Sequence, residues 1–264
     1  MSAYGEYALE TYVPDTKPFK GTWTSASSAT FSERRGNPNV IRLTLQDGKQ
    51  RHLDVSTSAI WDESNGVGDW GYDEAGSQGG DKWQYFYAVP ESGDDDRLAT
   101  RVSDNPPTTG PAGYSNWELV WATYDLGGDL KQVHQVGNSF GYRSHQGPSS
   151  LPPLFGWQAD WTDYSIDDVV PLSCGTVHLW QCIVHTSGAG QTQPVVVGPE
   201  GGGWLIPNYA LGSHDDSHVV GDVPTLGGES KEISVYNYSW GGPTDRVLHQ
   251  EISILGWIDE WIKP

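Results

Sequence analysis

The residues of this chain that could do chemistry are mostly carboxylates and histidines, and they are densest in one short segment. That segment reads His214-Asp215-Asp216-Ser217-His218. Imidazole and carboxylate groups bind zinc and other divalent ions, and a tetrahedral site uses three or four of them. The segment follows Leu211-Gly212, which indicates a loop, where histidines four residues apart need not converge as they would on a helix. A metal site and a solvated loop are both open readings.

Two acidic loops could supply the oxygen ligands that calcium prefers. One is Gly93-Asp94-Asp95-Asp96, and a longer loop contains Asp62, Glu63, Asp69, Asp73 and Glu74. Neither has the ligand spacing or the distal glutamate of an EF-hand. We therefore expect no cofactor, while calcium in one of these loops stays an alternative to plain polar turns.

Signals for catalysis are weak. Glycoside hydrolysis needs two carboxyl groups about 5–10 Å apart. The pairs Asp62–Glu63 and Asp259–Glu260 are adjacent in sequence, so they would face opposite ways on a strand.

One Gly-x-Ser-x-Gly match, Gly137-Asn138-Ser139-Phe140-Gly141, follows a strand-like run. A nucleophile elbow requires a helix next, but residues 142–154 are polar and rich in proline. We predict a glycine-bounded turn here, and a protein that is not an enzyme.

Aromatic residues are the better candidates for binding, because Trp and Tyr combine a broad apolar face with a polar group. Trp70 and Tyr72 lie in a loop rich in glycine and aspartate, and Trp240 precedes two glycines. We predict that these three contact a ligand such as a sugar ring. Trp257 and Trp261, near the C terminus, are predicted to pack at a subunit interface.

The elements that must position these residues are strands. Residues 83–128 alternate aromatic or aliphatic with polar residues, and their connections are rich in Asp, Gly and Pro, which predicts an antiparallel meander. Residues 39–55 predict a hairpin that turns at Asp47-Gly48. With 33 Gly, 17 Pro, 13 Trp and 13 Tyr and no long helical period, the chain is predicted to be all-β.

The turn spacing predicts an antiparallel, jelly-roll-like β-sandwich in two parts. Residues 1–36 read as an N-terminal attachment arm, 37–146 as the first sandwich part and 147–264 as the second, with a break in the proline-rich stretch 144–154.

The net charge of −19 excludes nucleic acid and anionic membranes as natural partners, since phosphate binding needs clustered Lys and Arg. No window approaches a membrane span, and residues 1–10 lack the apolar segment of a secretory signal. We therefore expect synthesis in the cytoplasm and no membrane insertion.

The chain resembles tail-fibre, head-fibre and related virion proteins of tailed bacteriophages. In the first half the resemblance lies in an aromatic strand, an acidic turn, a second strand, a Gly-Tyr connector and a third strand: 83–89, 92–96, 98–103, Gly113-Tyr114 and 117–124. In the second half it lies in a Val-Pro-Leu element, a Ser-Lys-Glu-Ile strand and a Gly-Trp-Ile-Asp ending: 170–172, 230–236 and 256–259.

This resemblance implies a non-enzymatic virion protein that binds other virion proteins, assembles as a homotrimer and presents a surface to a host glycan. Two alternatives stay open. One is a carbohydrate-active enzyme or carbohydrate-binding module, and the other is a purely architectural capsid or tail connector.

Overall fold

The computed structural model describes residues 19–33, 40–54, 60–74, 76, 79–142, 161–185, 193–199, 206–210, 216–225, 231–237 and 247–262. Within these ranges the chain is β-strand and loop, apart from one short 3-10 helix, η1 (Glu63–Asn65). The strands form three sheets that are antiparallel except for one parallel bridge between His52 and Arg97. The prediction of an all-β, antiparallel sandwich is confirmed.

The strands of the largest sheet are β1 (Phe19–Ser25), β2 (Ser28–Glu33), β5 (Ile60–Asp62), β10 (Val133–Val136), β11 (Ser139–Tyr142), β13 (Cys174–His185), β16 (Asp216–Pro224) and β18 (Val247–Asp259). The six-stranded sheet contains β3 (Val40–Thr44), β4 (Gln50–Asp54), β6 (Lys82–Glu91), β7 (Asp94–Ser103), β8 (Glu118–Leu126) and β9 (Asp129–Leu130). The four-stranded sheet contains β12 (Thr162–Ser165), β14 (Gln193–Pro199), β15 (Ile206–Ala210) and β17 (Glu232–Asn237).

The predicted hairpin and meander are both present. Strands β3 and β4 pair from Val40↔Asp54 to Thr44↔Gln50. Strand β6 lies between β7 and β8 and is antiparallel to both. Both faces of β6 are covered, because Gln84 and Phe86 are as fully buried as Tyr85 and Tyr87.

The predicted N-terminal arm is wrong for residues 19–33. Strands β1 and β2 form a hairpin inside the largest sheet, with Thr22 opposite His134 of β10. Gly21, within the predicted arm, permits close packing, since a Cβ there would lie 2.6 Å from Cγ of Trp121. Its backbone N–H also donates to the buried side chain of Gln135.

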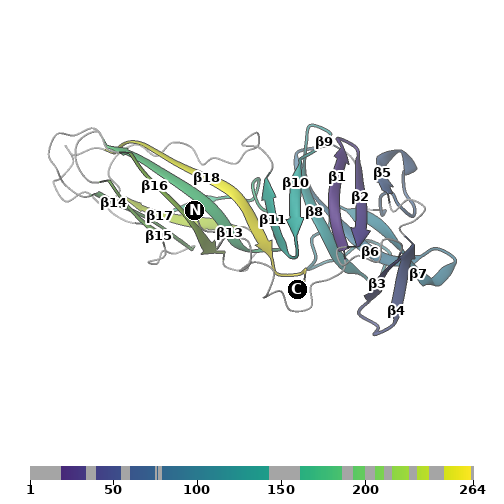
Figure 1. The fold of residues 1–264 in the computed structure, drawn as a ribbon. Coiled ribbons are helices and arrows are strands. Elements are labelled where there is room, and N and C mark those ends of the chain that lie inside the picture. Colours follow the sequence, from purple (N-terminus) through teal and green to yellow (C-terminus); the bar gives the residue numbers. More distant parts are fainter. Residues whose placement is uncertain are drawn as a thin grey trace, which may run out of the picture.

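The two predicted sandwich parts are joined by the largest sheet, whose strand order is β16-β13-β18-β11-β10-β1-β2-β5. The first three strands come from 147–264 and the other five from residues before 146, so the parts are not separate sandwiches. The predicted boundary itself lies outside the described residues. Figure 1 shows β18, in yellow, running from one end of the elongated molecule to its centre, where it reaches β11.

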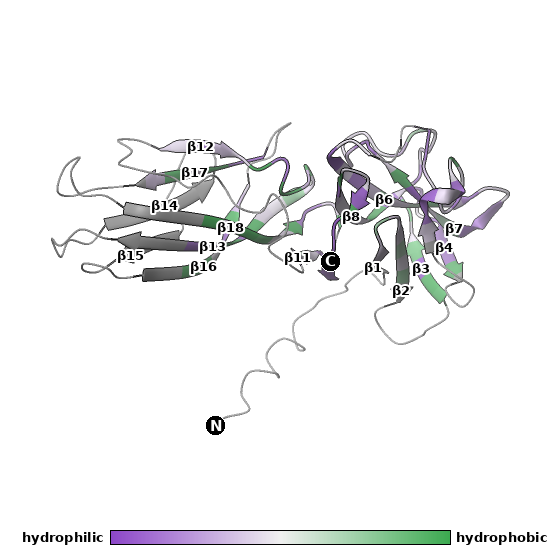
Figure 2. Cartoon of the chain, turned by 90° about the horizontal axis from the view of Figure 1, so that it is seen from above, coloured by the Kyte–Doolittle hydropathy of each residue, from purple (hydrophilic) through white to green (hydrophobic). Residues whose placement is uncertain are grey.

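The other two sheets keep to one half each. The strands of the six-stranded sheet lie at one end of the molecule and those of the four-stranded sheet at the other (Figure 2). Buried residues of β13 and β17, among them Leu179, Ile233 and Val235, belong to the same hydrophobic core. The four-stranded sheet therefore covers one face of β13.

Gly21→Ala should lower the free energy of unfolding by about 1–3 kcal/mol, because the added methyl group overpacks the Trp121 ring. At an open strand position the same change would stabilise by roughly 0.5–1 kcal/mol, so the sign of the effect is informative. Urea denaturation measures it. Thr22→Ala, at the exposed neighbouring position, is the control and should change stability by no more than about 0.5 kcal/mol. A Gly21→Ala protein as stable as the parent would refute the packing argument.

Candidate functional site

The predicted aromatic ligand contacts divide in three ways. Tyr72 is only 6% exposed and packs edge-on against Trp61, with ring centroids 5.4 Å apart. The structure therefore contradicts a ligand-binding role for Tyr72, because its ring is part of the core. Trp70 is partly buried and has a positive φ of 65°, and its role stays a prediction. Trp240 lies outside the described residues.

The two tryptophans predicted at an interface also differ. Trp257 is fully buried and lies stacked on Phe140 at 4.9 Å, with Trp83 edge-on at 5.3 Å. The interface prediction is wrong for Trp257, whose ring joins β18 to β11 and β6. Trp261 is 41% exposed beside Trp117, so its interface role stays a prediction.

The predicted metal segment is only partly described. His214 and Asp215 lie outside the described ranges, whereas Asp216 and His218 begin strand β16, opposite Val184 and Cys182. The loop predicted for this segment is thus wrong from Asp216 onward. Among the residues whose placement is described, no group of three or more His, Cys, Asp or Glu could hold a metal ion.

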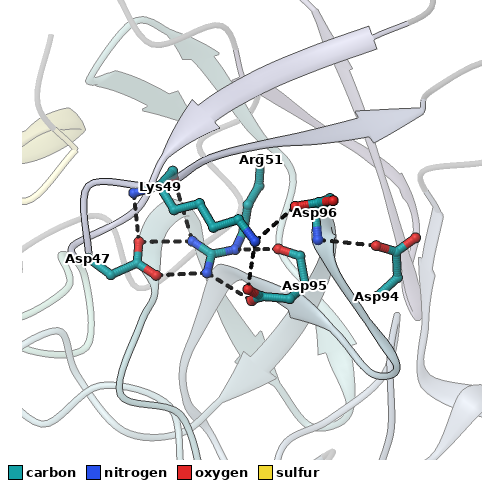
Figure 3. A network of polar contacts seen from close by, with 6 residues as sticks. All are labelled: Asp47, Lys49, Arg51, Asp94, Asp95 and Asp96. Carbon is teal, nitrogen blue, oxygen red and sulfur yellow. Dashed lines mark hydrogen bonds and ion pairs between the residues drawn. The ribbon is translucent and has the colours of Figure 1, made fainter.

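The acidic turn predicted as a calcium candidate is held by two cations of the β3–β4 hairpin, as Figure 3 shows. The buried Arg51 guanidinium donates to both carboxylate oxygens of Asp47 and, at 2.9 Å, to Asp95. Lys49 Nζ lies 2.7 Å from Asp95 and 2.8 Å from Asp96. These contacts attach the hairpin to the β6–β7 turn.

The network shifts the pKa values of its members. Hydrogen bonding from Arg51, with a smaller contribution from the Lys49 backbone N–H, lowers the pKa of Asp47 to about 2. Lys49, followed by Arg51, lowers the pKa of Asp95, and the pKa values of Lys49 and Arg51 are raised in return. These ionised carboxylates stabilise the contact between the hairpin and the turn. Because Lys49 and Arg51 already neutralise them, the turn is less suited to binding a calcium ion.

Three aspartates of the second acidic loop also have structural roles. Asp62 accepts from Ser64 N at 2.8 Å and caps η1. Asp69 accepts from Arg101 at 2.8 Å. Asp73 accepts from the backbone N–H groups of Gly76 and Ala112, each at 2.6 Å. The loop is a structural element closed by its own acidic side chains.

The carboxylate pair at the C terminus does not form a catalytic pair. Asp259 is fully buried, and burial raises its pKa to about 6 although Ser173 and the N–H groups of Trp261 and Ile262 donate to it. Glu260 is exposed. Asp259 therefore fastens the end of the chain to the segment before β13.

The Gly-x-Ser-x-Gly motif forms the predicted turn. Gly137 (φ 67°) and Asn138 connect β10 to β11, and β11 continues as a strand, so no nucleophile elbow is present. Ser139 nevertheless has a partner that sequence reasoning missed. Its Oγ lies 3.2 Å from Nε2 of His178, and Nδ1 of His178 lies 2.6 Å from Oδ1 of Asp222. We call these three residues the serine relay.

Sheet register brings the serine relay together. His178 of β13 is directly opposite Asp222 of β16 and Gly256 of β18, and Gly256 is opposite Gly141 of β11. Directly opposed residues share a face, and residues two apart on a strand do so as well, which places Ser139 on this face. Gly256 carries no side chain between His178 and β11, so the imidazole can reach across β18.

The serine relay is open to solvent. The side chains of His178 and Asp222 are 26% and 60% exposed. The same face carries Trp180, opposite Val220, whose side chain is 68% exposed. Within the described residues, this face of β16 and β13 therefore combines a solvent-accessible, hydrogen-bonded Ser-His-Asp chain with exposed Val220 and partly exposed Trp180.

Comparison with known proteins does not assign this site. No protein-family model matches the chain, and no curated protein is significantly similar to it. Within the part of the chain that the structure describes, no helix is long and apolar enough to cross a membrane.

Replacing Arg51 by Met should remove a part of the stability that depends on pH. The folded pKa of Asp47, about 2, lies below its ordinary value of 3.8. This carboxylate therefore stabilises the fold above about pH 4, and the contribution is lost as the pH falls toward 2. Thermal midpoints between pH 2 and 5 should fall less steeply in Arg51→Met than in the parent protein, and the difference should shrink in high salt.

Arg42→Met is the matched control, since Arg42 is exposed on the same hairpin. Its pH profile should parallel that of the parent. If Arg51→Met also gave a parallel profile, the network in Figure 3 would not stabilise the fold.

Proposed function

We propose that this chain is a structural protein of a bacteriophage virion, of the tail-fibre or head-fibre type, that attaches to the particle and presents a binding surface to a host glycan. The virion assignment rests on the sequence resemblance described above. The all-β fold and the acidic charge of −19 are compatible with it.

The observation that carries the binding part is a face of β16 and β13 on which Val220 and Asp222 are exposed and Trp180 is partly exposed. Along β16 exposure alternates, with Val220 and Asp222 exposed and Val223 buried, so only one face is used for the core. Partly exposed Trp180 and exposed Val220 form a cross-strand pair on the open face. A flat aromatic and aliphatic surface bordered by polar groups suits stacking against a sugar ring.

Assembly as a homotrimer is part of the proposal. Trp261 supplies an exposed indole near the C terminus, and repeated weak sites on one particle would gain avidity. A carbohydrate-binding module would use the same face, so glycan binding alone does not separate these two functions. Detection of the chain in purified particles does.

The open face predicts that Trp180→Ala weakens glycan binding about tenfold, the equivalent of about 1.4 kcal/mol of lost stacking. The measurement is binding of the full chain to a glycan array, followed by titration with the best ligand. Val136→Ser, which removes an apolar side chain that is 64% exposed on β10, is the control and should bind as the parent does. Trp70→Ala tests the loop site predicted from sequence.

Two results would contradict the proposal. A parent protein that binds no glycan but decorates a capsid or tail lattice would have the purely architectural role. A protein that binds glycan equally well with and without Trp180 would not use this face.

A further inference from the structure

We propose that Ser139 is an activated nucleophile, with His178 as its general base and Asp222 as the group that orients His178, and that it accepts acyl groups from esters. The proposal rests on two contacts, 3.2 Å from Ser139 Oγ to His178 Nε2 and 2.6 Å from His178 Nδ1 to Asp222 Oδ1. It extends beyond the proposed binding function.

The chemistry of the side chains fixes the direction of the proton chain. An ionised carboxylate only accepts hydrogen bonds, so Nδ1 of His178 is protonated and its N–H donates a hydrogen bond to Asp222 Oδ1. Nε2 is then unprotonated in neutral imidazole and can accept the hydroxyl proton of Ser139. This order of donor and acceptor is the one that activates serine in hydrolases of unrelated folds.

The surrounding backbone also favours the placement of the three side chains of the serine relay. A β-bulge in the β13–β18 pairing lies directly after His178, where Leu179 pairs with Ile254 and Leu255 is the additional residue. Bulges redirect neighbouring side chains and are enriched next to active sites. Beside the bulge, a Cβ at Gly256 would lie 2.0 Å from the Phe140 carbonyl oxygen, so glycine permits the close approach of β11 to β18.

The reaction balances without any further component except water. Ser139 Oγ attacks the ester carbonyl carbon while His178 Nε2 takes the hydroxyl proton. The bond to the alcohol oxygen then breaks, Nε2 returns the proton to that oxygen, and an acyl-Ser139 ester remains. Water then attacks the carbonyl carbon of the acyl-Ser139 ester while His178 Nε2 takes a proton from the water. The bond to Ser139 Oγ breaks, Nε2 returns the proton to Oγ, and the acid is released.

The open face favours a small acyl group carried on a large alcohol. Asp222 is 60% exposed, so the serine relay does not lie in an enclosed acyl pocket. Trp180 and Val220 lie two residues from His178 and Asp222 on the same face. An O-acyl substituent of a sugar polymer lying over Trp180 fits this placement. The choice of a sugar polymer as the alcohol rests on the proposed function. The proposed reactivity of Ser139 does not depend on that function.

Turnover should be slow. Strand β11 is paired with β10 on one side and β18 on the other, so its backbone N–H groups serve the sheet rather than an oxyanion. Covalent labelling of the serine is therefore a more direct readout than hydrolysis.

The test is incubation of the full chain with a fluorophosphonate, which bonds to an activated serine with loss of fluoride, and location of the adduct by peptide mass spectrometry. We expect labelling at Ser139 that is absent from Ser139→Ala and from the chain unfolded in guanidinium. His178→Gln should slow labelling by about 100-fold or more and Asp222→Asn by about tenfold or more. Circular dichroism confirms that each variant is folded.

Ser165→Ala is the matched control, because the Ser165 hydroxyl contacts a carboxylate, Asp167, and belongs to no Ser-His-Asp chain. It should label as the parent does. No adduct, or an adduct only at another serine, would overturn the proposal and show a cross-strand hydrogen-bond chain without reactivity. Labelling of Ser139 at an unchanged rate in His178→Gln would also overturn it, because His178 would then not be the general base. None of these outcomes bears on glycan binding through Trp180, so the two proposals fail separately.

Discussion

The fold depends on strand β18 being paired with strands from both halves of the chain. On one side it is antiparallel to β13, and on the other its last residues pair with β11. At the crossing point Trp257 is fully buried between Phe140 and Trp83, so the aromatic core is continuous where the sheet is continuous. Trp83 Nε1 donates to the Asp167 carbonyl oxygen and Leu172 N donates to Tyr85, which adds polar contacts across the same junction.

This pairing also determines which side chains meet on the solvent face. Ser139 and His178 are separated by one strand, and Gly256 on that strand leaves the space between them free of a side chain. Several other described carboxylates have structural roles. Asp95 binds Arg51 and Lys49, Asp69 binds Arg101, and Asp259 caps the C-terminal turn. The serine relay therefore lies outside the two acidic loops of the sequence.

Local sequence patterns predicted what local physics determines. Alternation and turn residues located the β3–β4 hairpin, the β6–β7–β8 meander and the turn at Gly137, because a strand and its neighbour there are close in sequence. The misread segments involve distant partners. Residues 1–36 suggested an attachment arm, but Gly21 in this segment packs against the Trp121 ring. Trp257 suggested an interface, but its ring stacks on Phe140.

The serine relay illustrates the same limit. The Gly-x-Ser-x-Gly match marked Ser139, and the absence of a following helix correctly predicted a turn. His178 and Asp222 carry no signal of their own, since each is one polar position in an alternating strand. Only the register of β11, β18, β13 and β16 places them beside the serine, and such long-range pairing is not encoded in any short window.

Differential scanning calorimetry tests the central claim most directly. If β18 and Trp257 make the two halves one cooperative unit, the chain should unfold in a single transition whose calorimetric and van't Hoff enthalpies agree. Trp257→Ala should lower the midpoint of that whole transition. Two resolved transitions in the parent protein, with Trp257→Ala shifting only one of them, would contradict the account.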